Sequence, residues 1–203
     1  MFLHEIMKGA DPSHLAFTGE VDVTYGALED AIHRYRNAIY ALGVREGERV
    51  SLYSANRPEF VYAFMAVVSL GAIIVPVNNS LVDREVDYIL KDSGSTLLIT
   101  DTPMDVSVPS ISIEELDEKS REPLPEAPDF PKSLTEDDVC ALIYTSGTTG
   151  SPKGAMLTHK NLVRNVEQFT ARIIFKPEDK VLCVLPMFHC YGMTTIVHGS
   201  LYA

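Results

Sequence analysis

Residues 60–82 contain no charged side chain, and this run constrains the fold more than any other stretch of the sequence. An uncharged run of this length can cross a bilayer. Gly71 and Pro76 interrupt it, however. The pattern therefore predicts a helix over residues 60–70 that ends at Gly71, followed by a strand over residues 72–77. A buried helix followed by a buried strand is typical of an α/β protein, and we favour this interpretation over a membrane span.

The same alternation of helix and strand continues on both sides of this run. It predicts an α/β fold with a mostly parallel sheet and helices on both faces. Thr24 and Thr158 are expected to cap two of the helices at their N-termini. The expected strands cover residues 49–54, 72–77, 96–100, 139–144, 155–157 and 180–185, and the expected helices cover residues 25–42, 60–70, 84–91, 159–172 and 193–201.

Composition and charge narrow the possible partners and the compartment. The formal net charge of −11 disfavours nucleic acid and anionic membrane surfaces as partners. The three cysteines fit no zinc or disulfide pattern, and the first residues lack the features of a signal peptide, so we expect a cytoplasmic protein. Residues 102–138 are rich in proline and acids, and the acids lack calcium-loop spacing, so we expect a solvated connector there.

Residues 139–154, VCALIYTSGTTGSPKG, combine a buried strand with a loop suited to phosphate. Glycines let backbone N–H groups approach an anion, hydroxyl side chains donate hydrogen bonds, and a lysine supplies positive charge. The loop is not the P-loop of kinases, which needs Gly-Lys-Ser/Thr followed by a helix. The expected phosphate-binding residues are Thr145, Ser146, Gly147, Thr148, Thr149, Gly150 and Lys153.

The segment YTSGTTGSPKGAMLTHKNL closely resembles the signature of the AMP-forming, adenylate-forming enzymes, and LPMFHCYG at residues 185–192 resembles the next motif of their acyl-CoA synthetase branch. The resemblance covers most of the chain. It implies an ATP-dependent ligase that activates a carboxylic acid as acyl-AMP and transfers it to CoA. It also implies that Lys153 and His189 are catalytic, that Thr145 lies near Mg²⁺, and that the acid is an acyl or aryl acid.

The resemblance ends before the family's later motifs. Residues 1–203 are therefore identified as the N-terminal portion of such an enzyme, without its C-terminal lid domain, and we expect this portion alone to be inactive. If the loops after strands 139–144 and 180–185 leave the carboxyl ends of one sheet, His189 and Lys153 face one crevice. The alternatives are a non-catalytic phosphate-binding or interaction module, and another adenylating enzyme such as an aryl-CoA ligase or a luciferase-like oxygenase.

Overall fold

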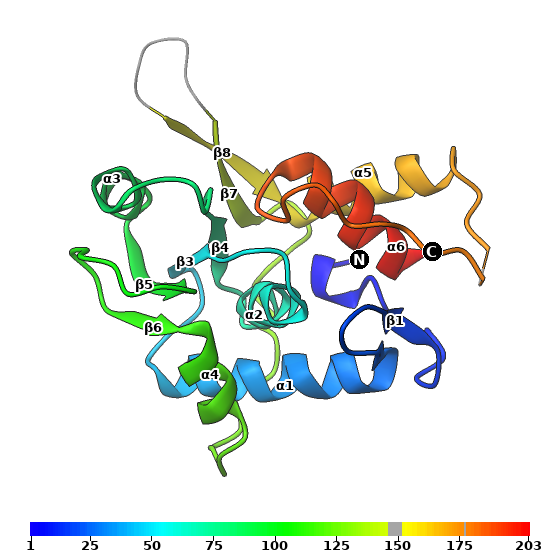
Figure 1. Ribbon diagram of the computed structural model, residues 1–203, viewed down its shortest axis with the longest axis horizontal. Helices are drawn as coiled ribbons and strands as arrows, with labels where there is room; N and C mark the ends of the chain where they lie inside the picture. Colours follow the sequence, from blue (N-terminus) through cyan, green and yellow to red (C-terminus); the bar gives the residue numbers. More distant parts are fainter. Residues whose placement is uncertain (146–151, 177) are drawn as a thin grey trace.

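The computed structural model describes residues 1–145, 152–176 and 178–203. A six-stranded sheet runs through its centre in the order β6-β5-β3-β4-β7-β8 (Figure 1). All neighbouring pairs are parallel except β7 and β8, which form an antiparallel hairpin. The mostly parallel sheet expected from the sequence is thus confirmed. The strands are β3 (Arg49–Tyr53), β4 (Ile73–Pro76), β5 (Ser95–Thr100), β6 (Ser110–Ser112), β7 (Val139–Thr145) and β8 (Lys153–Thr158).

Helices cover both faces of this sheet, as expected. Alternate residues of the strands point to opposite faces, so β3, β4, β5 and β7 each contribute to two clusters. One cluster packs under α3, and the larger one packs against α1, α2 and α4 (Figure 1). The described helices are η1 (Leu3–Glu5), α1 (Tyr25–Ala41), α2 (Pro58–Ser69), α3 (Asp83–Ser93), α4 (Ile113–Ser120), α5 (His159–Thr170), η2 (Gly192–His198) and α6 (Gly199–Tyr202). Strands β1 (Leu15–Phe17) and β2 (Val23–Thr24) form a small separate sheet.

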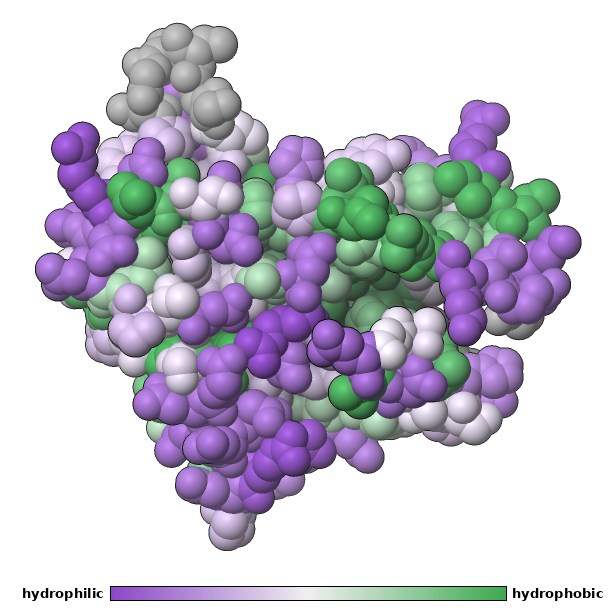
Figure 2. Space-filling view, viewed as in Figure 1, coloured by the Kyte–Doolittle hydropathy of each residue, from purple (hydrophilic) through white to green (hydrophobic). Residues whose placement is uncertain are grey.

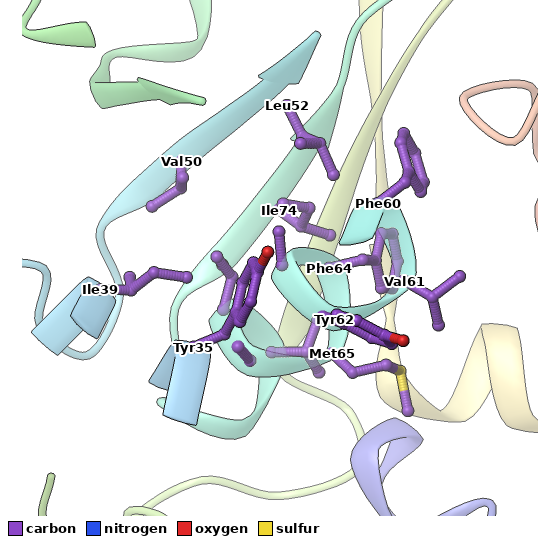
Figure 3. Close-up of a cluster of buried hydrophobic side chains, with 14 of the residues drawn as sticks. Tyr35, Ile39, Val50, Leu52, Phe60, Val61, Tyr62, Phe64, Met65 and Ile74 are labelled. Atoms are coloured by element: carbon purple, nitrogen blue, oxygen red, sulfur yellow. The ribbon is translucent and has the colours of Figure 1, made fainter. Parts of the chain in front are cut away.

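The uncharged run folds as the helix–strand unit that its glycine and proline predict. Helix α2 has proline at its first residue, and Gly71 follows it with φ +72, a backbone conformation that favours glycine. Phe60 and Phe64 of α2 point into the cluster beneath it, where they meet Leu52 of β3 and Ile74 of β4 (Figure 3). No helix built from the described residues is both long and apolar enough to cross a membrane.

Both predicted N-caps are present. The Thr24 hydroxyl accepts a hydrogen bond from Ala27 N, and the Thr158 hydroxyl accepts one from Asn161 N at 3.1 Å. The proline-rich connector forms helix α4 where one or two helical turns were expected over residues 113–119, and it also contributes strand β6 beside β5, which was not expected.

One predicted strand is wrong. Residues 180–185 form no strand and have no strand partner in the described part of the chain, and most of their side chains are exposed. Leu182 is 77% exposed and Val184 is 70% exposed. Figure 2 shows hydrophobic side chains gathered on the surface beside α5 and along the segment that follows it. A short continuous apolar run favours a buried strand, but a strand also needs a neighbour for its backbone hydrogen bonds.

Candidate functional site

The base of the β7–β8 hairpin brings two of the predicted site residues together. Thr145 is the last residue of β7 and Lys153 is the first residue of β8, and the two are direct partners in the antiparallel register. Directly paired residues of antiparallel strands have their side chains on the same face. Both side chains are exposed. Five further predicted residues, Ser146, Gly147, Thr148, Thr149 and Gly150, lie outside the described residues.

Helix α3 braces this hairpin through two tyrosines. The Tyr144 hydroxyl donates a hydrogen bond of 2.6 Å to Asp92 Oδ2, and the Tyr88 hydroxyl donates one of 3.4 Å to the Pro152 carbonyl. Burial, with the nearby Asp92 carboxylate, raises the pKa of Tyr144, so its hydroxyl stays protonated and keeps this bond. The strand ends on both sides of the loop are thereby tied to the α3 side of the sheet.

Gly154 lets the Tyr144 ring cross the hairpin. Gly154 pairs with Tyr144 in the register, and a Cβ atom at this glycine would lie 3.0 Å from Tyr144 Cζ. That approach is closer than ordinary carbon contacts, which begin at about 3.5 Å. The glycine at the end of the signature therefore supports the position of the tyrosine at its start.

His189 lies in a tight turn before the last helix. Its backbone N–H donates to the Pro186 carbonyl at 3.1 Å, and its carbonyl accepts from Met193 N at 2.9 Å. The Nδ1 atom of its ring accepts a hydrogen bond of 3.2 Å from Tyr191 N. Since a backbone N–H can only donate, the neutral ring carries its proton on Nε2. The exposed imidazole can therefore offer Nε2–H to a ligand oxygen.

The turn around His189 differs from the sequence-based expectation in two ways. No strand precedes it, so the predicted crevice between two strand ends is wrong on this side, and the helix begins at Cys190 rather than after Gly192. Gly192 packs directly onto the turn, because a Cβ atom there would collide with the Pro186 carbonyl oxygen. The turn is thus closed by backbone contacts in place of a strand.

The turn nevertheless lies against the same face of the hairpin as Thr145. Cys190 and Met193 line a small apolar cavity together with Ile143 of β7 and Leu157 of β8. Since side chains alternate along a strand, Thr145 shares the face of Ile143, while Tyr144 points to the α3 side. The fold therefore brings the His189 turn onto the face of β7 that Thr145 and Lys153 share at its end. Within the described residues, no hydrogen bond or ion pair joins His189 to Lys153.

Sequence reasoning missed Asn56, which lies between β3 and α2. Its side chain makes hydrogen bonds to the backbone of residues 183–187, on the chain that leads to His189. A single asparagine ahead of Arg57 and Pro58 carries no pattern that predicts such a distant contact. From the sequence, Asn56, Arg57 and Pro58 were expected only to start the helix that follows.

Metal ligands are sparse in this region. Across residues 1–145, 152–176 and 178–203, no group of three or more histidine, cysteine, aspartate or glutamate side chains is arranged to hold a metal ion. The Thr145 hydroxyl is one neutral oxygen ligand. Mg²⁺ commonly takes few protein ligands and completes its coordination with water and substrate phosphates. The residues present therefore fit a magnesium ion only as a partner of bound phosphates.

Comparison with known proteins places this geometry in a family. A family model described as AMP-binding enzyme matches residues 7–203. The chain is 37% identical over 183 residues to a feruloyl-CoA synthase from Amycolatopsis sp, covering 86% of this chain and 36% of that protein. It is 31% identical over 196 residues to the long-chain-fatty-acid–CoA ligase FadD13 of Mycobacterium tuberculosis, covering 90% of this chain and 39% of that one.

Solved structures agree with the sequence comparisons. O-succinylbenzoate coenzyme A synthetase (MenE) from Bacillus subtilis, in complex with AMP, superposes with a TM-score of 0.87 at 29% identity, over 98% of this chain and 53% of that one. ATP-bound MatB from Rhodopseudomonas palustris gives 0.88 at 26% identity, over 100% and 44%. The chain thus spans well under half the length of the curated relatives named above. It belongs to the AMP-binding enzyme family, and its match to the N-terminal portion of the acyl-CoA ligases is confirmed.

Proposed function

We propose that this chain forms the ATP-binding part of an acyl-CoA ligase, which activates a carboxylic acid as acyl-AMP and passes the acyl group to CoA. The observation that carries the proposal is the pairing of Thr145 with Lys153. It sets an exposed hydroxyl and an exposed ammonium group side by side at the two ends of residues 146–151. Those residues are rich in glycine and hydroxyl groups, which suits a polyphosphate. The solved MenE and MatB structures hold AMP and ATP.

The chemistry requires charge control more than proton transfer. The acid is already a carboxylate at neutral pH, and it must approach the α-phosphorus of ATP while pyrophosphate leaves. A positive charge close to the departing phosphates stabilises the negative charge that they carry away and so lowers this barrier. The Lys153 ammonium group supplies that positive charge. His189 can donate Nε2–H to an oxygen of the carboxylate or of the α-phosphate, which holds the two reacting groups in line.

Thr145 is the proposed protein ligand of Mg²⁺. When bound, the ion would neutralise phosphate charge. The chain's own contribution is the position of the hydroxyl, which strand β7 fixes at the hairpin base. Tyr144 and Asp92 hold that base through their hydrogen bond.

The acid remains one of two classes. The relatives named above include a feruloyl-CoA synthase, whose acid is aromatic, and a long-chain-fatty-acid–CoA ligase. We propose a carboxylic acid of the acyl or aryl type for this protein. We also propose a cytoplasmic location, since the three cysteines are free and a reducing compartment keeps them so.

Nucleotide binding by the 203-residue chain tests the proposal first. Calorimetry with ATP and Mg²⁺ should show binding, and Lys153→Ala should weaken it about tenfold through loss of one charge-assisted hydrogen bond. Lys160→Ala is the matched control, because Lys160 lies on α5 and pairs with Asp137, and it should bind ATP like the wild type. Absence of ATP binding by the wild-type chain would reject the proposal.

Measurements of turnover test the proposed chemistry, in which acyl-AMP forms and Lys153 stabilises the departing phosphates. These 203 residues span only 36% of the feruloyl-CoA synthase, and we propose that they do not form acyl-AMP alone. Acid-dependent exchange of pyrophosphate into ATP by the chain would contradict this. In the enzyme that contains the chain, Lys153→Ala should cost on the order of 2–4 kcal/mol of transition-state stabilisation. Unchanged turnover in that variant would remove Lys153 from the mechanism.

A further inference from the structure

The Asn56 carboxamide holds the chain that leads into the His189 turn. Its Nδ2 donates a hydrogen bond of 2.8 Å to the Leu185 carbonyl and one of 3.3 Å to the Cys183 carbonyl. Its Oδ1 accepts a hydrogen bond of 2.8 Å from Met187 N. These contacts join positions 127 to 131 residues apart in the sequence. Both ends of one amide side chain are thus engaged with one distant segment.

The pattern of these bonds imitates a neighbouring strand. The Leu185 carbonyl and the Met187 N–H flank Pro186, and the N–H and C=O of one residue in a parallel strand would bond to the same two groups. Pro186 has no N–H of its own, so the arrangement leaves no donor unsatisfied at the central residue. Asn56 therefore supplies the hydrogen bonds that a strand partner would give at the end of residues 180–185, which lack one.

The turn that follows is fixed relative to this point. The Pro186 carbonyl accepts from His189 N, and Gly192 closes onto the same carbonyl. In the part of the chain that the structure describes, Asn56 is the only side chain from outside residues 176–203 that hydrogen-bonds to residues 178–191. Loss of its carboxamide would leave the turn attached only through its own helix and apolar packing.

Asn56 also connects the turn to the end of the sheet at which β7 ends in Thr145. It follows β3, whose parallel neighbour β4 pairs with β7 in the same direction. The carboxyl ends of β3 and β7 therefore lie at one edge, where Thr145 ends β7. A rigid link from this edge to the His189 turn keeps the imidazole at a fixed place relative to the hairpin.

We propose that Asn56 is a positioning residue for His189. It touches neither nucleotide nor acid, and it acts by holding residues 183–187 so that Nε2–H of His189 stays directed toward the reacting oxygens. The inference rests on the proposed function for the role of His189. The hydrogen bonds from Asn56 to residues 183–187, which we call the clamp, are a property of the 203-residue chain and can be measured without turnover.

Two readouts on the 203-residue chain test the clamp. In Asn56→Ala, hydrogen exchange of the Met187 amide should rise about tenfold, because its acceptor is removed. Alkylation of Cys183, which is half-buried beside Asn56, should accelerate several-fold relative to the same cysteine in the wild-type chain. Asn79→Ala at the same sheet edge is the control and should match the wild type in both measurements.

A second variant separates the two ends of the carboxamide. Asn56→Asp keeps the acceptor for Met187 N and loses the donor to Leu185. It should keep most of the protection at the Met187 amide and still accelerate Cys183 alkylation. Wild-type values of both readouts in Asn56→Ala, with the same fold by circular dichroism, would overturn the clamp.

Kinetics of the enzyme that contains the chain test the positioning role. Asn56→Ala should lower kcat about tenfold with little change in KM for ATP, because the phosphate loop is untouched and the imidazole is displaced. An unchanged kcat alongside a loosened turn would overturn the positioning role. Failure of the wild-type chain to bind ATP would reject the proposed function instead, and it would leave the exchange and alkylation results unaffected.

Discussion

Helix α2 and residues 181–185 are both nearly pure runs of apolar side chains, yet the helix is buried and residues 181–185 are mostly exposed. Nine residues of α2, from Phe60 to Val68, are buried. Leu182 and Val184 are at least 70% exposed. The difference lies in the neighbours: α2 lies over β3 and β4 and meets α1 at Tyr35, whose ring lies 5.6 Å from that of Tyr62 (Figure 3). Residues 181–185 have the side chain of Asn56 and little else.

This contrast shows that an apolar pattern indicates a segment's tendency to be buried but does not identify the surface that buries it. It marks a segment that will be buried when a partner surface is present, since burial of apolar area drives folding. It does not state that the partner lies within the same 203 residues. A helix satisfies its own backbone hydrogen bonds, whereas a strand depends on another segment for them. An apolar strand is therefore the element that loses its structure first when its neighbour is missing.

The largest expected effect compares the same substitution in both regions. Leu52→Ala removes a fully buried side chain of β3, and it should lower the free energy of unfolding by about 2–5 kcal/mol. Leu182→Ala removes an exposed side chain and should change it by less than about 0.5 kcal/mol. Urea unfolding followed by circular dichroism measures both. Similar losses in the two variants would mean that residues 181–185 are covered in solution.

A pH effect of intermediate size concerns η2, which follows residues 181–185 in the chain and packs against α2 through His198 and Phe64. His198 is fully buried beside Phe64, with ring centroids 5.2 Å apart, and neither ring nitrogen has a hydrogen-bond partner among the described residues. Burial lowers the pKa of His198 to about 4 from its usual 6.5. Between these values the unfolded chain binds more protons than the folded chain, so stability falls as the pH is lowered from 6.5 to 4.

The lowered pKa of His198 sets the size of the stability lost in acid, and His198→Leu is the variant that tests it. The pKa difference corresponds to about 3 kcal/mol, present above pH 6.5 and lost by pH 4. His198→Leu should remove this part of the pH dependence and leave stability at pH 7.5 equal or higher, since no unpartnered ring is then buried. Burial also lowers the pKa of His159 to about 4, so some acid loss should remain. An unchanged acid profile in His198→Leu would show that His198 is solvated.

A smaller effect concerns α5, which leads from the covered region to the exposed one. The Thr158 hydroxyl accepts from Asn161 N, and the Asn161 side chain accepts from Thr158 N, each at 3.1 Å. Thr158→Ala should cost about 1 kcal/mol, because it leaves a helix N-terminal donor unsatisfied. Thr158→Ser keeps the hydroxyl and should cost less. Thermal unfolding of both variants checks the difference, and equal losses would point to the methyl group instead of the cap.

Most of the fold followed from local signals in the sequence. Gly71 ended the helix before it, and Thr24 and Thr158 capped helices as expected, because each acts on residues within one turn of itself. The parallel direction of β3, β4 and β5 followed from the alternation of helix and strand, whereas their order in the sheet was not predicted. These features depend on contacts close in sequence or on a general rule of topology.

The candidate site was predictable only in part. The motif singled out Thr145 and Lys153 as site residues, and the structure pairs them at the base of the β7–β8 hairpin, which the sequence did not predict. The support from Asn56 and from the Tyr144–Asp92 bond joins residues 52 to 131 positions apart, and no local pattern encodes such contacts. Residues 180–185 failed as a strand for the same reason: their pattern was local, while the requirement for a partner was not.

The smallest expected effect on stability is also the sharpest probe of the exposed region. Leu182 and Val184 are exposed on either side of the half-buried Cys183, and Val184 N donates a hydrogen bond of 3.1 Å to the Leu182 carbonyl, so the three residues form a tight turn. Exposed apolar residues on a segment without a partner favour association between molecules. Replacing both with serine should change the free energy of unfolding by less than about 0.5 kcal/mol and reduce concentration-dependent self-association in light scattering. A Leu182→Ile variant keeps the apolar surface and should associate like the wild type. Equal association of the serine variant and the wild type would show that these two side chains take no part in contacts between molecules.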